Sequence, residues 1–227
     1  MLASFMRFSC VLFDLDGTLI DHFHAIHRCH AYAMCQLGLP EPTLAQVRAA
    51  VGGGLDEAIA RLAGAEKVEA IRPHFLHLWE KTNLHDVIAL PGSAEILQAL
   101  RDRGILCAVL TNKRGYAARE VCSHLGLTPM LRGIFGADDT PWIKPQPEFT
   151  EYALEQLGVN AADTVLVGDS PFDVATAVSG RLGFVGVATG THTAGELHAA
   201  GAGRVAADLA GVAAELGLDA AAVMPRS

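Results

Sequence analysis

The sequence lacks the features that mark nucleic-acid-binding, membrane and secreted proteins. Its 17 Lys and Arg are outnumbered by 25 Asp and Glu, and the formal net charge of -8 disfavours a nucleic-acid partner, because phosphate backbones are bound by basic patches. No apolar run approaches the roughly 20 residues of a membrane span. The first residues, MLASFMRFSCVLF, contain neither a basic leader nor a signal-peptide cleavage site. We therefore expect neither nucleic acid nor a membrane as a partner.

Closely spaced cysteines are absent as well. The chain has five cysteines and no CxxC pair. Scattered cysteines in a chain of this length are typical of reduced, mostly buried thiols in a cytosol-like compartment. We expect a cytoplasmic protein, monomeric or homodimeric, in which a local cationic pocket for a small phosphorylated metabolite is compatible with the overall acidity.

What the sequence does contain is a series of short apolar runs separated by helical patterns. With 51% hydrophobic and 19% charged residues among 227, the chain can bury a large core. The runs do not alternate with polar residues, which predicts strands buried on both faces of a parallel sheet. These runs are CVLF (10–13), ILCAVL (105–110), TVLVG (164–168) and GFVGVA (183–188). The helical patterns each end at a glycine and cover 93–104, 116–126 and 147–158. This order predicts an α/β, Rossmann-like doubly wound fold, in which ligands bind beyond the carboxyl ends of the strands.

One segment departs from this alternation. Helical patterns follow one another without a strand at 22–38, 43–50, 55–63 and 66–82. We expect a small all-helical domain at 21–86, inserted after the first strand, with hinges near 19–21 and 85–87. Residues 1–20 and 87–227 then form the α/β core. The alanine-rich end, 206–223, is expected to form a closing helix.

Two carboxylates directly follow the first predicted strand. Asp14 and Asp16 are two residues apart, so in extended chain both side chains point to the same side. Two such charges are costly unless a cation joins them or one takes a proton. Gly17 then permits a tight turn with exposed amides, which suits an anion beside a metal.

Polar residues also follow the other predicted strands. Thr111 and Asn112 end the second strand with groups able to bind phosphate oxygens, and Lys144 lies in KPQPE, before a helix. GDSPFD ends a further strand with Asp169 and Asp173. Oxygen ligands of this kind favour Mg²⁺ over zinc. Each of these features alone is weak evidence and is more simply explained by helix caps and surface charges.

Taken in order, DLDGT, LTN, the Lys144 of KPQPE and GDSPFD resemble the four motifs of the haloacid dehalogenase superfamily of phosphohydrolases. The helical insertion lies where that family places a C1-type cap. The resemblance implies that Asp14 is a nucleophile that forms an aspartyl-phosphate, and that Asp16 is the general acid and then the base. The Asp16 backbone carbonyl would help to bind Mg²⁺.

The resemblance extends to the remaining motif residues. Asp169 would bind Mg²⁺ directly, with Asp173 an outer ligand or a partner of Lys144. Mg²⁺ and Lys144 would offset the repulsion between Asp14 and the phosphate dianion, while Thr111 and Asn112 would hold phosphoryl oxygens.

Several activities within this superfamily remain open. VGGGLDEA, with Gly52, Gly53 and Gly54, resembles the cap of phosphoglycolate phosphatases, and a helix opening there could present its amides to a substrate carboxylate. The same stretch is compatible with a plain helix connection. Phosphoglycolate is the favoured substrate; the alternatives are an inorganic pyrophosphatase, a β-phosphoglucomutase-like enzyme and, more remotely, an inactive binding or regulatory member. A dehalogenase is disfavoured, because those enzymes lack the second aspartate.

Four histidines follow the catalytic motif. His24, His27 and His30 step by three residues on a predicted helix, so each turns about 60° from the last instead of stacking on one face. We therefore expect no histidine metal site, and we expect His22 or His24 to face the substrate pocket. Lys113 and the arginine that follows it add positive potential at the pocket mouth or lie on a solvated helix start.

Overall fold

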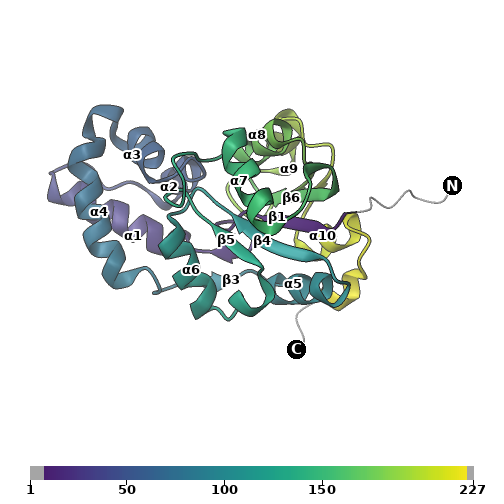
Figure 1. Cartoon of the computed structure of the whole chain (residues 1–227). Helices are drawn as coiled ribbons and strands as arrows, with labels where there is room; N and C mark the ends of the chain where they lie inside the picture. The colour runs from purple at the N-terminus through teal and green to yellow at the C-terminus, as the bar shows by residue number, and fades with distance from the viewer. Residues whose placement is uncertain (1–7, 224–227) are drawn as a thin grey trace.

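The computed structural model describes residues 8–223, and its centre is a parallel six-stranded sheet (Figure 1). Strand β1 lies in the middle and pairs with β4 on one side and β6 on the other. From edge to edge the strands are β5 (Gly133–Phe135), β4 (Leu106–Leu110), β1 (Cys10–Phe13), β6 (Thr164–Gly168), β7 (Gly183–Val187) and β8 (Val205–Ala206). The four predicted strands are confirmed; β5 and β8, at three and two residues, were not predicted.

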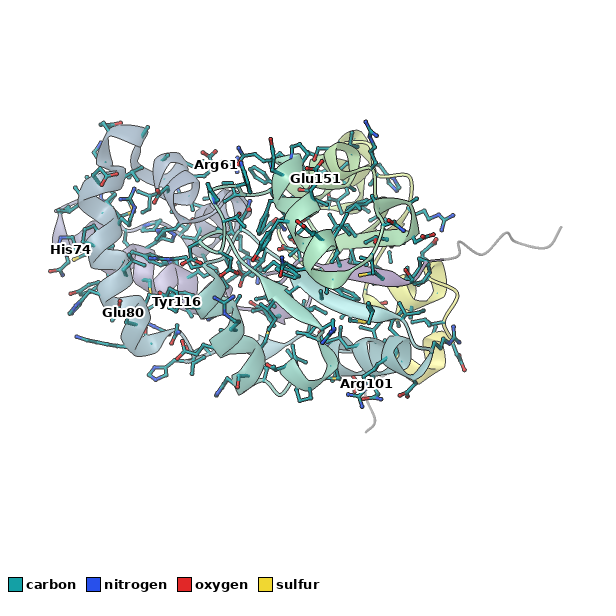
Figure 2. The ribbon with its side chains drawn as sticks, in the orientation of Figure 1. Arg61, His74, Glu80, Arg101, Tyr116 and Glu151 are labelled. Carbon is teal, nitrogen blue, oxygen red and sulfur yellow. The ribbon has the colours of Figure 1, made fainter. Side chains whose placement is uncertain are left out.

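Helices cover both faces of this sheet, which confirms the doubly wound α/β fold. They are α5 (Ser93–Asp102), α6 (Gly115–His124), α7 (Pro147–Leu157), α8 (Pro171–Gly180), α9 (Ala194–Ala199) and α10 (Leu209–Glu215). Charged side chains lie outside: in Figure 2, Arg101 on α5 and Glu151 on α7 point away from the sheet on opposite faces. The carboxyl ends of the strands are thereby left as the place where polar side chains from different strands can meet.

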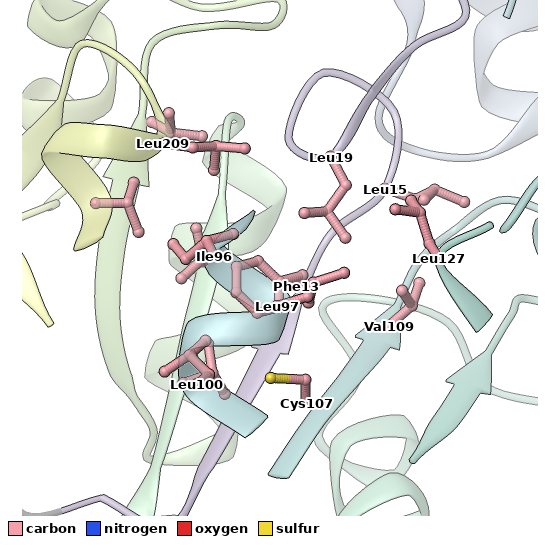
Figure 3. Close-up of a cluster of buried hydrophobic side chains, with 14 of the residues drawn as sticks. Phe13, Leu15, Leu19, Ile96, Leu97, Leu100, Cys107, Val109, Leu127 and Leu209 are labelled. Carbon is pink, nitrogen blue, oxygen red and sulfur yellow. The ribbon is translucent and has the colours of Figure 1, made fainter. Parts of the chain in front are cut away.

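Alternate residues of β1 pack into two different hydrophobic clusters. Val11 and Phe13 join the cluster shown in Figure 3, with side chains of α5, α6 and α10. Cys10 and Leu12 join a cluster on the other face, with Phe149 and further residues of α7. Because both faces are covered, every β1 residue is buried, which explains the unbroken apolar run.

The segment between β1 and α5 forms a helical lobe, defined here as helices α1 to α4. These are α1 (Phe23–Gln36), α2 (Leu44–Ala50), α3 (Leu55–Ala63) and α4 (Val68–Thr82). The lobe has its own hydrophobic cluster and lies to one end of the sheet in Figure 1. An antiparallel pair, β2 (Ile20–Asp21) and β3 (Ile88–Ala89), connects it to the sheet. The helices follow the predicted segments, while the division into a domain at 21–86 stays a prediction.

The alanine-rich end differs from the prediction of one closing helix over 206–223. Ala206 belongs to the edge strand β8, and the Asp208 side chain accepts a hydrogen bond from Gly211 N, which starts α10. Gly217, at φ 73°, follows the end of α10, and a short 3₁₀ turn, Ala220–Val223, comes last. The high helix propensity of alanine is therefore outweighed by the Asp208 cap, which sets the start of α10, and by Gly217, which follows its end.

The cysteines and the helix lengths agree with what the composition predicts. All five cysteines are free, and four of them are buried, as expected. Within residues 8–223, no helix has both the length and the apolar character that crossing a membrane requires.

Candidate active site

The carboxyl edge of the sheet brings the predicted motif residues together. Asp14 and Asp16 follow β1, Thr111 and Asn112 follow β4, and Asp169 follows β6. Parallel strands whose carboxyl ends lie side by side impose this proximity on residues far apart in the chain. All five are buried or nearly so; Asp14 is 7% exposed and Asp169 2%.

Lys144 joins two of the acidic residues. Its Nζ donates to Asp14 Oδ1 at 2.7 Å and to Asp173 Oδ1 at 2.7 Å, and all three side chains are buried. Burial alone would lower the pKa of Lys144, but the two carboxylates outweigh it and hold the pKa above its ordinary range. Lys144 is therefore a fixed cation at the back of the site.

One ammonium does not balance the carboxylates around it. Oxygens of Asp14, Asp169 and Asp173 lie within 4.8 Å of one another. Burial, opposed by Lys144 and reinforced by Asp173, raises the pKa of Asp14 to about 6. Burial, with Asp14 and Asp173 adding to it, raises the pKa of Asp169 to about 8. The excess of buried negative charge can be balanced by a bound cation or by a proton on one of the carboxylates.

The donor set of this cluster fits a hard divalent cation such as Mg²⁺. It offers carboxylate oxygens from Asp14, Asp169 and Asp173 and contains neither thiolate nor imidazole. Mg²⁺ prefers oxygen ligands and binds through one or two carboxylates while keeping other positions for water and phosphate. Lys144 pairs with Asp14 and Asp173, so Asp169 is the member of this cluster without an ion pair among the described residues.

A shell of hydrogen bonds fixes the orientation of Asp169. Thr191 N donates to its Oδ2 at 2.8 Å, and Thr18 Oγ1 donates to its Oδ1 at 3.3 Å. Gly17, at φ 89°, and Gly190 leave the space that this carboxylate occupies, because a Cβ at Gly190 would lie 1.8 Å from Oδ2. Sequence reasoning missed Thr18, Gly190 and Thr191, since only the fold brings them to Asp169.

Asp16 has different partners from the other carboxylates. Lys113 Nζ donates to both of its oxygens, at 3.0 Å and 2.9 Å, and His22 Nδ1 lies 3.5 Å from Oδ1. Burial would raise the pKa of Asp16, but Lys113 and His22 reverse this and hold it below its ordinary range. The sequence left the role of Lys113 open; the structure places it inside the site.

Asn112 holds two loops together. Its Nδ2 donates to the backbone carbonyls of Gly52, at 2.9 Å, and Lys144, at 3.1 Å, and its Oδ1 accepts from Lys144 N at 2.8 Å. The Asn112 side chain thus links the glycine turn before α3, residues 52–54, to the loop that carries Lys144. Phosphate binding by Thr111 and Asn112 stays a prediction.

A cavity of about 100 Å³ separates these residues from the lobe. Gly52 and Gly54 line it, with Gly54 as the N-cap of α3 at φ 90°. Gly53 is buried and does not line it, because it packs near Phe172. The glycine turn therefore reaches the site through two of its three predicted residues.

The prediction for the histidines was wrong in part. His24 is exposed and does not line the cavity. His22 is fully buried beside Asp16, and its Nε2 donates to the Asn83 carbonyl at 2.5 Å, so it supports the site without lining the cavity. The histidine that lines the cavity is His30, since two further helical turns bring the inner face of α1 back to the site.

The chain resembles known hydrolases over most of its length. Residues 11–187 match the family described as haloacid dehalogenase-like hydrolase. A 5'-nucleotidase of Pseudomonas aeruginosa is 30% identical over 207 residues, which cover 90% of this chain and 94% of that protein. A phosphoglycolate phosphatase of Xanthomonas campestris pv. campestris is 34% identical over 177 residues, covering 76% and 80%.

Solved structures show the same fold. A predicted phosphoglycolate phosphatase from Haemophilus somnus superposes with a TM-score of 0.84 at 23% identity, covering 91% of this chain and 96% of that one. A hydrolase from Pseudomonas syringae gives a TM-score of 0.78 at 24% identity, covering 92% and 98%.

Proposed function

Since the chain belongs to the haloacid dehalogenase-like hydrolase family and is a phosphatase, we propose that it is a Mg²⁺-dependent phosphomonoester hydrolase that acts through an aspartyl-phosphate. One observation carries the proposal. Asp14, at the end of the central strand, is held by Lys144 beside the acidic cluster of Asp169 and Asp173. Such a site places a nucleophile beside a lysine and beside carboxylates that can hold a cation, and a bound cation together with Lys144 would supply the positive charge that a phosphate dianion requires.

The first step is the transfer of the phosphoryl group to Asp14. A carboxylate oxygen of Asp14 forms a bond to phosphorus while the bond from phosphorus to the ester oxygen breaks. Asp16 gives its proton to that oxygen, so an alcohol leaves. Before this step Lys113 would turn from Asp16 to the incoming phosphate, and Asp16 would take from water the proton that it then gives to the ester oxygen.

The second step returns the enzyme to its starting state. Asp16 takes a proton from a water molecule, which attacks phosphorus, and the bond to the Asp14 oxygen breaks to release inorganic phosphate. Lys144 keeps Asp14 in position through both steps. A bound Mg²⁺, held by Asp14, Asp169 and the Asp16 carbonyl, would stabilise negative charge on the phosphoryl oxygens.

Two substrates are supported by the relatives. Phosphoglycolate is suggested by relatives named phosphoglycolate phosphatase, which are about a third identical. A nucleoside 5'-monophosphate is supported by the relative named 5'-nucleotidase. The free cysteines favour the cytoplasm as the compartment of the reaction.

A panel assay tests the reaction. Phosphate release with Mg²⁺ is measured for phosphoglycolate, nucleoside 5'-monophosphates, β-glucose 1-phosphate and pyrophosphate, for the wild type and for Asp14→Asn. We expect hydrolysis of at least one monoester and a phosphoenzyme that hydroxylamine removes, both absent in the variant. Release from pyrophosphate alone, or no phosphoenzyme, would contradict the proposal.

A further inference from the structure

The wall of the cavity that faces the phosphate site is apolar. It is formed by the lobe and α6, and its side chains include Ile26, Leu55, Phe75, Leu76, Trp79 and Tyr116. Phe75 and Trp79 stack with their ring centroids 5.5 Å apart. A leaving group that extends from the phosphate therefore meets hydrocarbon and aromatic surface.

His30 and the hydroxyl of Tyr116 are polar exceptions within this wall. His30 is 1% exposed, lines the cavity and packs on Phe75 with ring centroids 4.6 Å apart. Among the described residues, nothing forms a hydrogen bond with its Nδ1. A buried imidazole nitrogen without a partner costs free energy, and a ligand group that displaces the ring enough to reach Nδ1 recovers this cost. Burial, with a smaller contribution from His27, lowers the pKa of His30 to about 4, so the ring is neutral near pH 7.

Among the described residues, the wall of this cavity offers no unpaired cation to a second anionic group. The two basic residues that line the cavity are already paired, Lys113 with Asp16 and Arg114 with Asp138 at 3.0 Å. In the lobe, Arg48 pairs with Asp21, and it does not line the cavity. A carboxylate or second phosphate placed here would lose its hydration without gaining a counter-charge.

The N-terminus of α3 does not supply that charge either. Gly54 and Leu55 bring it to the cavity, but its first turn already carries Asp56 and Glu57. Their partners Arg72 and Arg61 are not among the cavity-lining residues. An anion at these amides would share them with two carboxylates of the helix itself.

We infer that this site, taken as a phosphomonoesterase as proposed above, selects esters of a small, uncharged, largely apolar alcohol that bears one polar atom, and that His30 hydrogen bonds to that atom. The cavity volume of about 100 Å³ favours a small alcohol, because it is smaller than the ~150 Å³ of an engineered apolar cavity that binds benzene. Phosphoglycolate, whose leaving group is an anion, is a poor substrate under this inference.

A matched pair of substrates tests the charge preference. Phosphoglycolate and phosphoglycolamide have the same number of heavy atoms and differ by one charge, and kcat/KM is measured for both with Mg²⁺. We expect the amide to be preferred by about tenfold or more. Equal or better turnover of phosphoglycolate would overturn the inference and leave the proposed function standing. Failure to hydrolyse any ester and to form a phosphoenzyme would contradict the proposed function itself.

Variants of the wall test the role of His30. In His30→Phe, kcat/KM for the amide should fall about tenfold, while that for propyl phosphate, which has no polar atom to offer, stays near its wild-type value. His30→Asn, which keeps a neutral donor and acceptor, should recover part of the loss. Equal losses on both esters would show that His30 is only structural and contradict its assignment.

Two further variants test whether the apolar wall sets the charge preference. His74→Leu removes a histidine of α4 that lies outside the cavity-lining set, on the outer side of the lobe in Figure 2, and should change neither ratio. Leu76→Lys places a cation on the apolar wall and should raise kcat/KM for phosphoglycolate relative to the amide. If it does not, and the variant is folded by circular dichroism, the wall does not set the charge preference.

Discussion

The Lys113 ammonium contacts both carboxylate oxygens of Asp16, at 3.0 Å and 2.9 Å, with both side chains nearly buried. Removing the lysine leaves a buried carboxylate with only the neighbouring imidazole of His22, so Lys113→Met should destabilise the fold by about 3 kcal/mol. Urea unfolding measures this. The double variant Lys113→Met/Asp16→Asn should recover most of the loss, because it removes the unpaired charge as well. Additive losses in the double variant would show that the pair is not coupled.

The unbalanced acidic cluster predicts an unusual pH dependence in metal-free protein. Burial and neighbouring carboxylates raise the pKa of Asp169 to about 8, above its unfolded value of 3.8. Between these values the folded state binds more protons than the unfolded state, so stability falls as pH rises towards 8. With EDTA present, the melting temperature should therefore decrease from pH 6.5 to 8.

Mg²⁺ should reverse this trend. A cation replaces the proton that the cluster otherwise takes up, so Mg²⁺ should raise the melting temperature more at pH 8 than at pH 6.5. Binding at 100 times the dissociation constant contributes about 2.7 kcal/mol. In Asp169→Asn, both the pH slope in EDTA and the Mg²⁺ effect should shrink. An unchanged Mg²⁺ shift in this variant would place the ion elsewhere.

Gly190 gives a test of the hydrogen-bonded shell around Asp169. A Cβ at this position would lie 1.8 Å from Asp169 Oδ2, so Gly190→Ala must displace the carboxylate or the loop. We expect Mg²⁺ affinity, measured by calorimetry, to weaken about 10- to 100-fold. Gly195→Ala is the matched control: its Cβ would have only Thr193 Oγ1 nearby, at 4.0 Å. Equal affinities in the two variants would contradict the role of Gly190.

The parts of the fold that the sequence predicted are those with strong local signals. Unbroken apolar runs identified β1, β4, β6 and β7. By contrast, β5 and β8 are too short to be recognised from their hydrophobic pattern. The motif residues were predicted because DLDGT, LTN, KPQPE and GDSPFD, taken in order, resemble the four motifs of one superfamily. Thr191 and His30 were not, since their roles depend on tertiary contacts: one reaches Asp169 from the loop after β7, and the other reaches the cavity across the lobe.

His30 also predicts a loss of stability in mild acid. Burial lowers its pKa to about 4 from an ordinary value of 6.5, so between these values the unfolded state binds more protons and the folded state loses stability as pH falls. At 1.36 kcal/mol for each pKa unit, the contribution is limited to about 3 kcal/mol. His30→Phe lacks this group, so the difference in unfolding free energy between the variant and the wild type should shift by up to that amount, in favour of the variant, from pH 6.5 to pH 4. Carboxylates that titrate in the same range are present in both proteins, and their effects cancel in the difference. A difference that stays constant across this range would show that His30 takes up its proton in the folded state as easily as in the unfolded one, and that its burial in the cavity wall does not hold it neutral.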